Sequence, residues 1–347
     1  MNSIKHENEE IMEDEKIELC CPAGNLPSLK AAIDSGADVV YLGFRNATNA
    51  RNFEGLNFSN KDIGNGIEYA HKKGKKVYIA INTFPQFHDE KVWFESVDNV
   101  VHLGADAAII ANMGILQYAA ETYPDLRLHL SVQGSSSNVE SLNFYREHFN
   151  VKRAVLPRVL TVEEIREIKD EMSDFELEVF GFGGLCINIC GRCYLSSYIT
   201  GVSCNTGGVC SPSSFVSFEN EGNELKVSLG SVVLNKYAPG EVTSYPTSCK
   251  GRYYFNGEEL GYPIEEPSSL NVLEILPQMI GSGADSLKVE GRQRTRSYVS
   301  TMTGILRDAI DRYYDDPEGY YVDDKWMEQA AQTMEGMQTT YGSYIQK

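Results

Sequence analysis

DVVYLG (38–43) is a short apolar run, followed by the helix-like segment KDIGNGIEYAHKKG (61–74) and then by a second apolar run, KVYIAIN (76–82). The order repeats at once with VWFESVDNVVHLG (92–104) and DAAIIA (106–111). Both helix-like segments end in glycine, the residue that most readily adopts the left-handed conformation at a helix C-terminus. Short apolar strands that alternate with amphipathic helices are typical of a parallel β-sheet.

The same pattern extends in both directions. Five further apolar runs are predicted strands: IELCC (17–21), LRLHLSV (126–132), RAVLP (153–157), ELEVFGF (176–182) and DSLKVEG (285–291). Further helix-like segments are PSLKAAIDSG (27–36), TVEEIREIKDEM (161–172), SLNVLEILPQMIGSG (269–283) and SYVSTMTGILRDAIDRYY (297–314). Eight strands predict an α/β fold, a (β/α)8 TIM-like barrel with a cysteine-rich insertion before the last strand. The alternative is an open doubly wound sheet, but CPAGNLPS after the first run lacks the G-x-G-x-x-G fingerprint of such folds.

The predicted organisation has three parts. Residues 1–17 form an acidic tail that we expect to be disordered, residues 18–317 form the barrel, and residues 318–347 form a C-terminal extension. Residues 183–268 lie within the barrel as the cysteine-rich insertion, with β-like runs at SSFVSF (213–218) and LKVSLGSVVL (225–234).

Composition limits the classes of function. The net charge of the 347-residue chain is −18, which argues against a large nucleic-acid-binding face. Net charge does not exclude a basic cleft for a small anion. The sequence contains neither an apolar run long enough to span a membrane nor a secretory signal, so we expect a cytoplasmic protein without a transmembrane segment.

Six of the eight cysteines fall between positions 186 and 249, whereas Cys20 and Cys21 lie in the first strand. The six are Cys186, Cys190, Cys193, Cys204, Cys210 and Cys249. Disulfides are not expected in a reducing cytoplasm, so the cluster indicates metal or redox chemistry. Thiolates suit an iron–sulfur centre or tetrahedral zinc, and spacing alone leaves both open, together with free thiols.

Polar side chains follow most of the predicted strands. In a barrel these strand ends form the functional face. The candidates for substrate binding are Asn82, Gln133, Lys288, Glu290, Arg292 and Arg294. Other polar residues at strand ends are Asn46, Asn49, Arg51, Asn112, Ser135 and Arg158. Cations gathered in a cleft of an acidic protein often bind an anion, but the group after the last strand could instead be a structural ion-pair set that closes the barrel.

Several long motifs are recognisable: FGFGGLCINICGRCYLSSYITG, GVCSP, YPTSCKGRY, EEPSSLN and KVEGRQRTRSYV. Together with CPAGNLPSLKAAI, AINTFP, LPRVL and EGMQTTYG, they resemble the collagenase-like peptidase U family, and within it the UbiU-like branch. The resemblance runs from about Glu18 to the C-terminus. It implies that Cys186, Cys193, Cys210 and Cys249 hold a 4Fe-4S cluster. Cys190 and Cys204 lie outside the matched ligand pattern, and we expect Cys20 and Cys21 to be structural.

The resemblance also implies a function. UbiU-like proteins are associated with oxygen-independent hydroxylation in ubiquinone biosynthesis, as a heterodimer with a paralogous UbiV-like subunit. The expected ligands are a polyprenyl-phenol quinone precursor and a prephenate-like anion as oxygen donor. Lys288, Arg292 and Arg294 would hold the anion, Glu290 would orient them or move a proton, and Asn82 and Gln133 would line the pocket.

Three other functions stay open on the sequence alone. Hydroxylation of an RNA base occurs in the wider family, but it would need an RNA-binding face that a partner could supply. A noncatalytic iron–sulfur scaffold subunit is also compatible with the sequence. A peptidase has no support, because the sequence has no HExxH, no GxSxG and no convincing Cys–His pair, and His129 lies in a predicted strand as a core residue.

Overall fold

The computed structural model describes residues 16–52, 55–188, 190, 192–204, 210–256, 258–334 and 338–345. The predicted acidic tail lies outside the described residues as far as position 15. Ile17, the last residue assigned to that tail, already packs in the hydrophobic core with 3% of its surface exposed.

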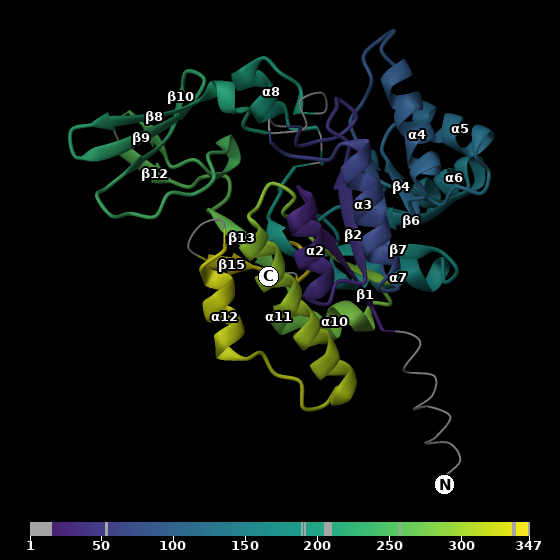
Figure 1. The fold of residues 1–347 in the computed structure, drawn as a ribbon. Helices are drawn as coiled ribbons and strands as arrows, with labels where there is room; N and C mark the ends of the chain where they lie inside the picture. The colour runs from purple at the N-terminus through teal and green to yellow at the C-terminus, as the bar shows by residue number, and fades with distance from the viewer. Residues whose placement is uncertain are drawn as a thin grey trace.

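Eight parallel strands close into a barrel, which confirms the predicted fold class (Figure 1). They are β1 (Glu18–Pro22), β2 (Val39–Gly43), β3 (Lys76–Ile81), β4 (Ala107–Ile110), β5 (Leu128–Leu130), β6 (Val151–Val155), β7 (Glu176–Gly184) and β14 (Ser286–Val289). Each strand pairs with the next in this order, and β14 pairs with both β7 and β1. The ring is therefore closed, and the open-sheet alternative is excluded.

An outer layer of helices covers the barrel. It consists of α2 (Leu26–Asp34), α3 (Asn60–His71), α4 (Lys91–Leu103), α5 (Met113–Thr122), α6 (Val139–Phe149), α7 (Val162–Glu171), α10 (Leu276–Gly281) and α11 (Arg296–Asp315). The helix starts follow local chemistry. The predicted capping box at the start of α7 is present, with Thr161 and Glu164 each accepting from the other's backbone N–H.

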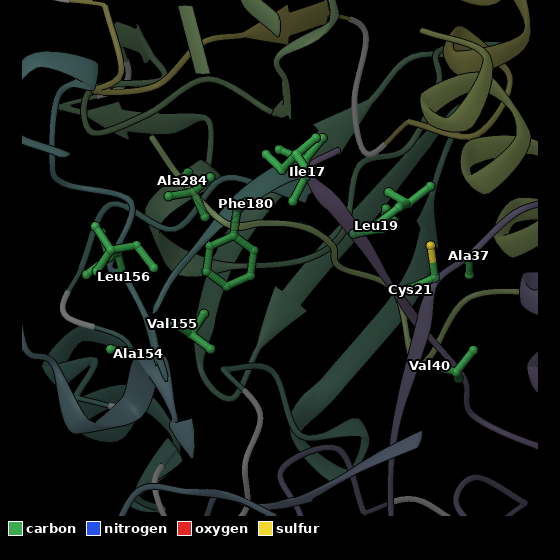
Figure 2. Close-up of a cluster of buried hydrophobic side chains, with 14 of the residues drawn as sticks. Ile17, Leu19, Cys21, Ala37, Val40, Ala154, Val155, Leu156, Phe180 and Ala284 are labelled. Atoms are coloured by element: carbon green, nitrogen blue, oxygen red, sulfur yellow. The ribbon is translucent and has the colours of Figure 1, made fainter. Parts of the chain in front are cut away.

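Alternate residues of each strand face two different cores. Leu19 and Cys21 of β1 and Val40 of β2 lie in the large apolar core that strands and helices share (Figure 2). Cys20 points the other way, into a smaller cluster with Tyr41 inside the barrel. This alternation is the period-two geometry of a strand buried on both faces, and it explains the continuous apolar runs in the sequence. Both cysteines are fully buried, as expected for structural residues.

The structure differs from the sequence prediction at residues 269–283, which read as one helix. Their first part is strand β13 (Ser268–Asn271), followed by the 3-10 turn η4 (Leu273–Ile275) and the short helix α10. Strand β7 extends beyond the end of β6, and β13 fills the free edge by antiparallel pairing with Phe182–Gly184. Pairing with a distant strand therefore overrides the local helical pattern.

The insertion carries a short helix and two small antiparallel sheets on one side of the barrel (Figure 1). Its elements are α8 (Tyr194–Thr200), η2 (Ser213–Phe215), β8 (Val216–Glu221), β9 (Glu224–Leu229), β10 (Val232–Tyr237), η3 (Ser248–Lys250), β11 (Tyr253–Phe255) and β12 (Glu258–Gly261). The predicted run 225–234 is thus a hairpin of two strands, β9 and β10, with Gly230 at a positive φ of 57° in the turn.

The C-terminal residues return to the barrel wall. Helix α12 (Asp324–Ala331) packs near α11, and β15 (Gln338–Thr340) pairs with β13. Tyr344 is buried, and its hydroxyl both donates to the Phe180 carbonyl and accepts from the Phe180 N–H at 3.0 Å. Among the described residues, no helix is long and apolar enough to cross a membrane.

Candidate functional site

A cavity of about 190 Å3 opens at the C-terminal ends of the barrel strands, under the first part of the insertion. Its lining contains all six predicted substrate-binding residues, namely Asn82, Gln133, Lys288, Glu290, Arg292 and Arg294. Five cysteines also line it: Cys186, Cys190, Cys193, Cys204 and Cys210. Two groups of residues that lie far apart in the sequence therefore share one pocket.

The four predicted ligand cysteines come from separate elements. Cys186 follows β7, Cys193 is the N-cap of α8, and Cys249 lies in η3. Cys210 follows a segment outside the described residues. All eight cysteines are free, so none of these thiols is blocked by a disulfide.

The surroundings of these thiols include hydrogen-bond donors and the charge of neighbouring thiols. The Cys193 sulfur accepts from the Ser196 N–H at 3.5 Å and from Asn188 Nδ2 at 3.6 Å. Burial raises the pKa of Cys193, Cys210 and Cys249, in the case of Cys210 to about 12, and charge on the other thiols raises these pKa values further. Charge on Cys186 contributes to the raised pKa of all three thiols, and a bound cationic centre would offset that charge.

Cys186 differs from the other three. The neighbouring Cys190 thiol donates a hydrogen bond that lowers the pKa of Cys186 to about 6, and Arg158 acts in the same direction. A thiol that ionises this readily is suited to metal ligation, because the thiolate is the ligand form. Among the described residues, no three Cys, His, Asp or Glu side chains are grouped closely enough to hold a single metal ion.

Arg158 connects the cysteines to the rest of the pocket. It is 6% exposed, its guanidinium lies 3.5 Å from the centroid of the Phe180 ring, and Nη1 is 3.6 Å from the Cys190 sulfur. Its other terminal nitrogen pairs with Glu290, which Arg51 also approaches at 3.5 Å. The Arg158 Nε is buried and has no hydrogen-bond partner among the residues that the structure describes.

Arg292 is a buried cation of a different kind. It is 6% exposed, and it donates to Asn49 Oδ1 and to the Ala50 carbonyl. Asn49 can approach because residue 43 is glycine: a Cβ there would lie 2.3 Å from the Asn49 carboxamide. No carboxylate forms an ion pair with Arg292 in the part of the chain that the structure describes, and burial lowers its pKa to about 10. The guanidinium is still charged at neutral pH and is suited to an anion from outside.

Lys288 belongs to both the pocket and the barrel interior. Its ammonium pairs with the fully buried Glu178 and lies 3.7 Å from the centroid of the Tyr41 ring. Glu178 also pairs with Arg153, which contacts Glu18 in turn. The structural ion-pair set considered from the sequence is therefore present around Lys288, while Lys288 also forms part of the cavity lining.

Arg294 is held by the C-terminal region. It donates to the carbonyl of Thr333 and stacks on Tyr298 with 4.7 Å between the guanidinium carbon and the ring centroid. The lining as described thus has five cations, Arg51, Arg158, Lys288, Arg292 and Arg294, and one carboxylate, Glu290. The pocket is locally positive in a strongly acidic protein.

Neutral amides form the remaining polar part of the lining. Asn82 accepts the Ala50 N–H at 2.9 Å, which links the loops after β2 and β3. Gln133 is 9% exposed, and its buried Oε1 has no hydrogen-bond partner in the described part of the chain. The same holds for the Oε1 of Gln293.

Sequence reasoning missed part of this site. Arg158 is among the strand-end polar residues in the sequence but not among the predicted substrate-binding residues, and the structure places it in the lining. Cys190 and Cys204, which lie outside the ligand pattern that the resemblance implies, also line the cavity. Thr333 reaches the pocket from beyond α12, for which the sequence gives no signal. Asn112 behaves differently from the other strand-end polar residues, since it caps α5.

Histidine is not among the side chains that line the cavity as described. His129 lies in the barrel interior, fully buried and edge-on to Tyr78 with 4.7 Å between ring centroids, as predicted for a core residue. Burial lowers the pKa of His129, so its imidazole is uncharged inside the barrel.

The fold and pocket define an α/β-barrel protein with a cysteine-rich, cationic site at the barrel mouth. The profile of Peptidase family U32 matches residues 24–346, and the chain belongs to this family.

Three relatives illustrate its relationships. The chain is 32% identical over 318 residues to tRNA hydroxylation protein P1 of Bacillus subtilis (strain 168), covering 90% of this chain and 68% of the relative. It is 32% identical over 315 residues to tRNA hydroxylation protein P of Escherichia coli (strain K12), covering 85% and 68%. It is 35% identical over 311 residues to the uncharacterized protease MJ0090 of Methanocaldococcus jannaschii, covering 88% and 67%.

The chain thus spans about two thirds of the length of these relatives. The predicted family is confirmed. The narrower resemblance to the UbiU-like branch is not reflected in the names of these three relatives, two of which are named for hydroxylation of tRNA.

Proposed function

We propose that this protein is a component of an oxygen-independent hydroxylase that acts on a base of tRNA and holds a 4Fe-4S cluster on Cys186, Cys193, Cys210 and Cys249. The observation that carries the proposal is the single pocket in which three of these cysteines meet a group of buried cations. The names of the relatives favour tRNA as the acceptor.

The donor set fits an iron–sulfur cluster better than a single zinc ion. Tetrahedral zinc, with bonds of about 2.3 Å to sulfur, needs its four sulfurs within about 4 Å of one another. The described residues contain no group that close. A four-iron cluster is larger than one ion, so its ligand sulfurs stand further apart. When bound, the cluster would supply electron transfer.

The chain's own residues would then bind and orient the other reactant. Arg292 offers a buried guanidinium that forms no ion pair with a carboxylate among the described residues. Lys288, whose ammonium is paired with Glu178, also lines the cavity. A small anion with two carboxylates, such as a prephenate-like oxygen donor, suits this arrangement because guanidinium groups bind carboxylates through paired hydrogen bonds. Glu290, held between Arg51 and Arg158, would keep those arginines oriented toward the cavity.

Proteolysis is the activity suggested by the family name and by one relative's name, and the pocket does not favour it. The described lining offers no histidine that could serve as a base for a cysteine or serine nucleophile. Its thiols lie among arginines and a single carboxylate, which is an arrangement for ligation and anion binding.

A second candidate acceptor is the ring of a polyprenyl-phenol quinone precursor, with a paralogous UbiV-like subunit as partner. The long motifs around Cys186, Cys210 and Cys249 favour it, since they resemble the UbiU-like branch. The charge of −18 also suits a small-molecule acceptor better than a large RNA footprint, unless a partner chain supplies the RNA-binding face.

One experiment separates these functions. A strain lacking the gene is grown without oxygen, and both its digested tRNA nucleosides and its extracted quinones are analysed by mass spectrometry. We expect loss of a nucleoside that carries one additional oxygen atom, restored by the wild-type gene and by Cys21→Ser but not by Cys210→Ser. Cys21 is the matched control, because it is buried against α11 with Thr303 and lies outside the pocket. Loss of quinone with intact tRNA would replace the first proposal by the second, and no change in either would overturn both.

A further inference from the structure

The polar lining of the pocket contains two chemically different sets of side chains. The first set, called the cationic half, contains Arg158, Lys288 and Arg292. The second set, called the amide half, contains Asn82, Gln133 and Gln293. The two sets adjoin, since Arg292 and Asn82 both bond Ala50. A carboxylate only accepts hydrogen bonds, so the carboxylates of an anion cannot satisfy a carboxamide oxygen. The unpartnered oxygens of Gln133 and Gln293 need a ligand group that carries an N–H or O–H.

Gln133 is the best-defined member of the amide half. It lies in the 3-10 turn η1 (Val132–Gly134) directly after β5, and Ser131 caps that turn by accepting the Gln133 N–H at 3.3 Å. Ser135 ends the turn in the left-handed conformation at a φ of 57°. The backbone is thus fixed at both ends, and it presents the Gln133 side chain to the cavity.

The carboxamide oxygen of Gln133 has no hydrogen-bond partner among the described residues. This oxygen is buried, and 91% of the residue is removed from solvent. Buried polar groups are nearly always hydrogen-bonded, and an exception at a cavity wall indicates a group reserved for a ligand. The Asn82 carboxamide oxygen already accepts a hydrogen bond from the Ala50 N–H, so it is less suited to accept one from a ligand.

We propose that Gln133 is the specificity-determining residue for the acceptor, and that it pairs with the edge of a nucleobase. A carboxamide presents a donor and an acceptor side by side, and it matches a base edge on which an N–H stands next to a ring nitrogen or carbonyl. A phenol has one oxygen atom, so it cannot form two parallel hydrogen bonds with the carboxamide as a base edge can. The inference rests on the proposed function and decides between its two acceptors.

The test uses the purified full chain under anaerobic conditions. Binding of uridine, cytidine, adenosine, guanosine, phenol and malonate is measured by calorimetry for wild type and Gln133→Met, which keeps the side-chain length but removes both hydrogen-bonding atoms. We expect the preferred nucleoside to bind roughly tenfold or more weakly to the variant, because one bidentate pair to a base edge is lost. Malonate binding should stay within about twofold, since the cationic half is intact. A derivative of that nucleoside methylated on its ring edge should not bind wild type.

The matched control is Asn235→Leu. Asn235 is also a buried amide with an unpartnered oxygen, but it lies in β10, away from the cavity. The Asn235→Leu substitution should leave the affinity for every probe unchanged. A general loss of folding would instead lower malonate binding in both variants. Equal affinity of wild type and Gln133→Met for the nucleoside, failure of wild type to bind any of the four, or tighter binding of phenol would each overturn the proposal.

The role of Gln133 and the proposed function can be rejected independently of each other. If the gene is needed for a hydroxylated tRNA nucleoside but Gln133→Met restores it fully, the function stands and the role of Gln133 is rejected. If deletion leaves tRNA unchanged, the proposed function itself fails.

Discussion

Replacing Arg292 with methionine should weaken anion binding without destabilising the fold. The side chain is buried, charged at neutral pH, and held by Asn49 and the Ala50 carbonyl rather than by a carboxylate. Methionine retains an unbranched apolar stem of similar reach. The change therefore removes the charge and little of the packing.

The magnitude follows from these contacts. A hydrogen bond to a charged group contributes about 1.5–3 kcal/mol, so losing the contact with one carboxylate should raise the Kd for a dicarboxylate roughly ten- to 150-fold. The free energy of unfolding should change by less than about 1 kcal/mol, because the two lost hydrogen bonds are offset by relief from burying an uncompensated charge.

Arg153→Met is the matched control. Arg153 is equally buried, but it pairs with Glu18, Glu176 and the fully buried Glu178. Removing it leaves a buried carboxylate with one partner fewer, so we expect a loss of about 3–5 kcal/mol of stability. Calorimetric titration with malonate and urea unfolding of both variants measure the two quantities. Unchanged malonate affinity in Arg292→Met, or a loss of stability comparable to that of Arg153→Met, would refute the assignment of Arg292 to a ligand.

Three further predictions concern pH and the cysteines. Because burial lowers the pKa of Arg292 to about 10, malonate affinity should fall as pH rises through that value, whereas an ordinary arginine site would retain its affinity there. Burial alone would raise the pKa of Glu178, but Lys288 and Arg153 lower it overall. The ionised Glu178 therefore stabilises the fold at pH values above the ordinary carboxyl range, and this stabilisation is lost as pH falls through the pKa of the folded state. Glu178→Gln should accordingly unfold at lower urea than wild type at neutral pH, with a gap that narrows only below about pH 4; a constant gap would contradict this. Cys249→Ser should purify anaerobically with less iron and acid-labile sulfide than wild type, while Cys21→Ser should keep both; zinc without sulfide in wild type would rule out the cluster.

The strands were predictable because each is buried on both faces. The runs at 38–43 and 76–82 match β2 and β3 to within one residue at each end, since nothing except an interior parallel strand requires such a short, continuous apolar run. Residues 269–283 could not be predicted in the same way. Strand β13 forms within this segment because β7 is longer than β6 and leaves a free edge to pair with. That edge depends on the lengths of two distant strands rather than on the local sequence pattern.

The site was predictable where strand order alone determines position. Lys288 lies near the end of β14, and Arg292 and Gln133 follow β14 and β5. These strand ends meet at the barrel mouth, so the convergence of the three residues follows from the fold. The bridge that Arg158 makes between Cys190 and Glu290 depends on side-chain direction within loops, which spacing does not encode.

The way in which the insertion is attached to the barrel has an evolutionary consequence. The chain leaves the wall at Gly184 and rejoins it at Ser269, and these two residues are direct partners in the sheet. The excursion between them is a closed loop, and the entropy of closing such a loop grows only slowly with its length. The length of this excursion away from its cysteines can therefore change without disturbing barrel closure through β14 and β1. The cysteines themselves stay tied to the barrel mouth, because Cys186 follows β7.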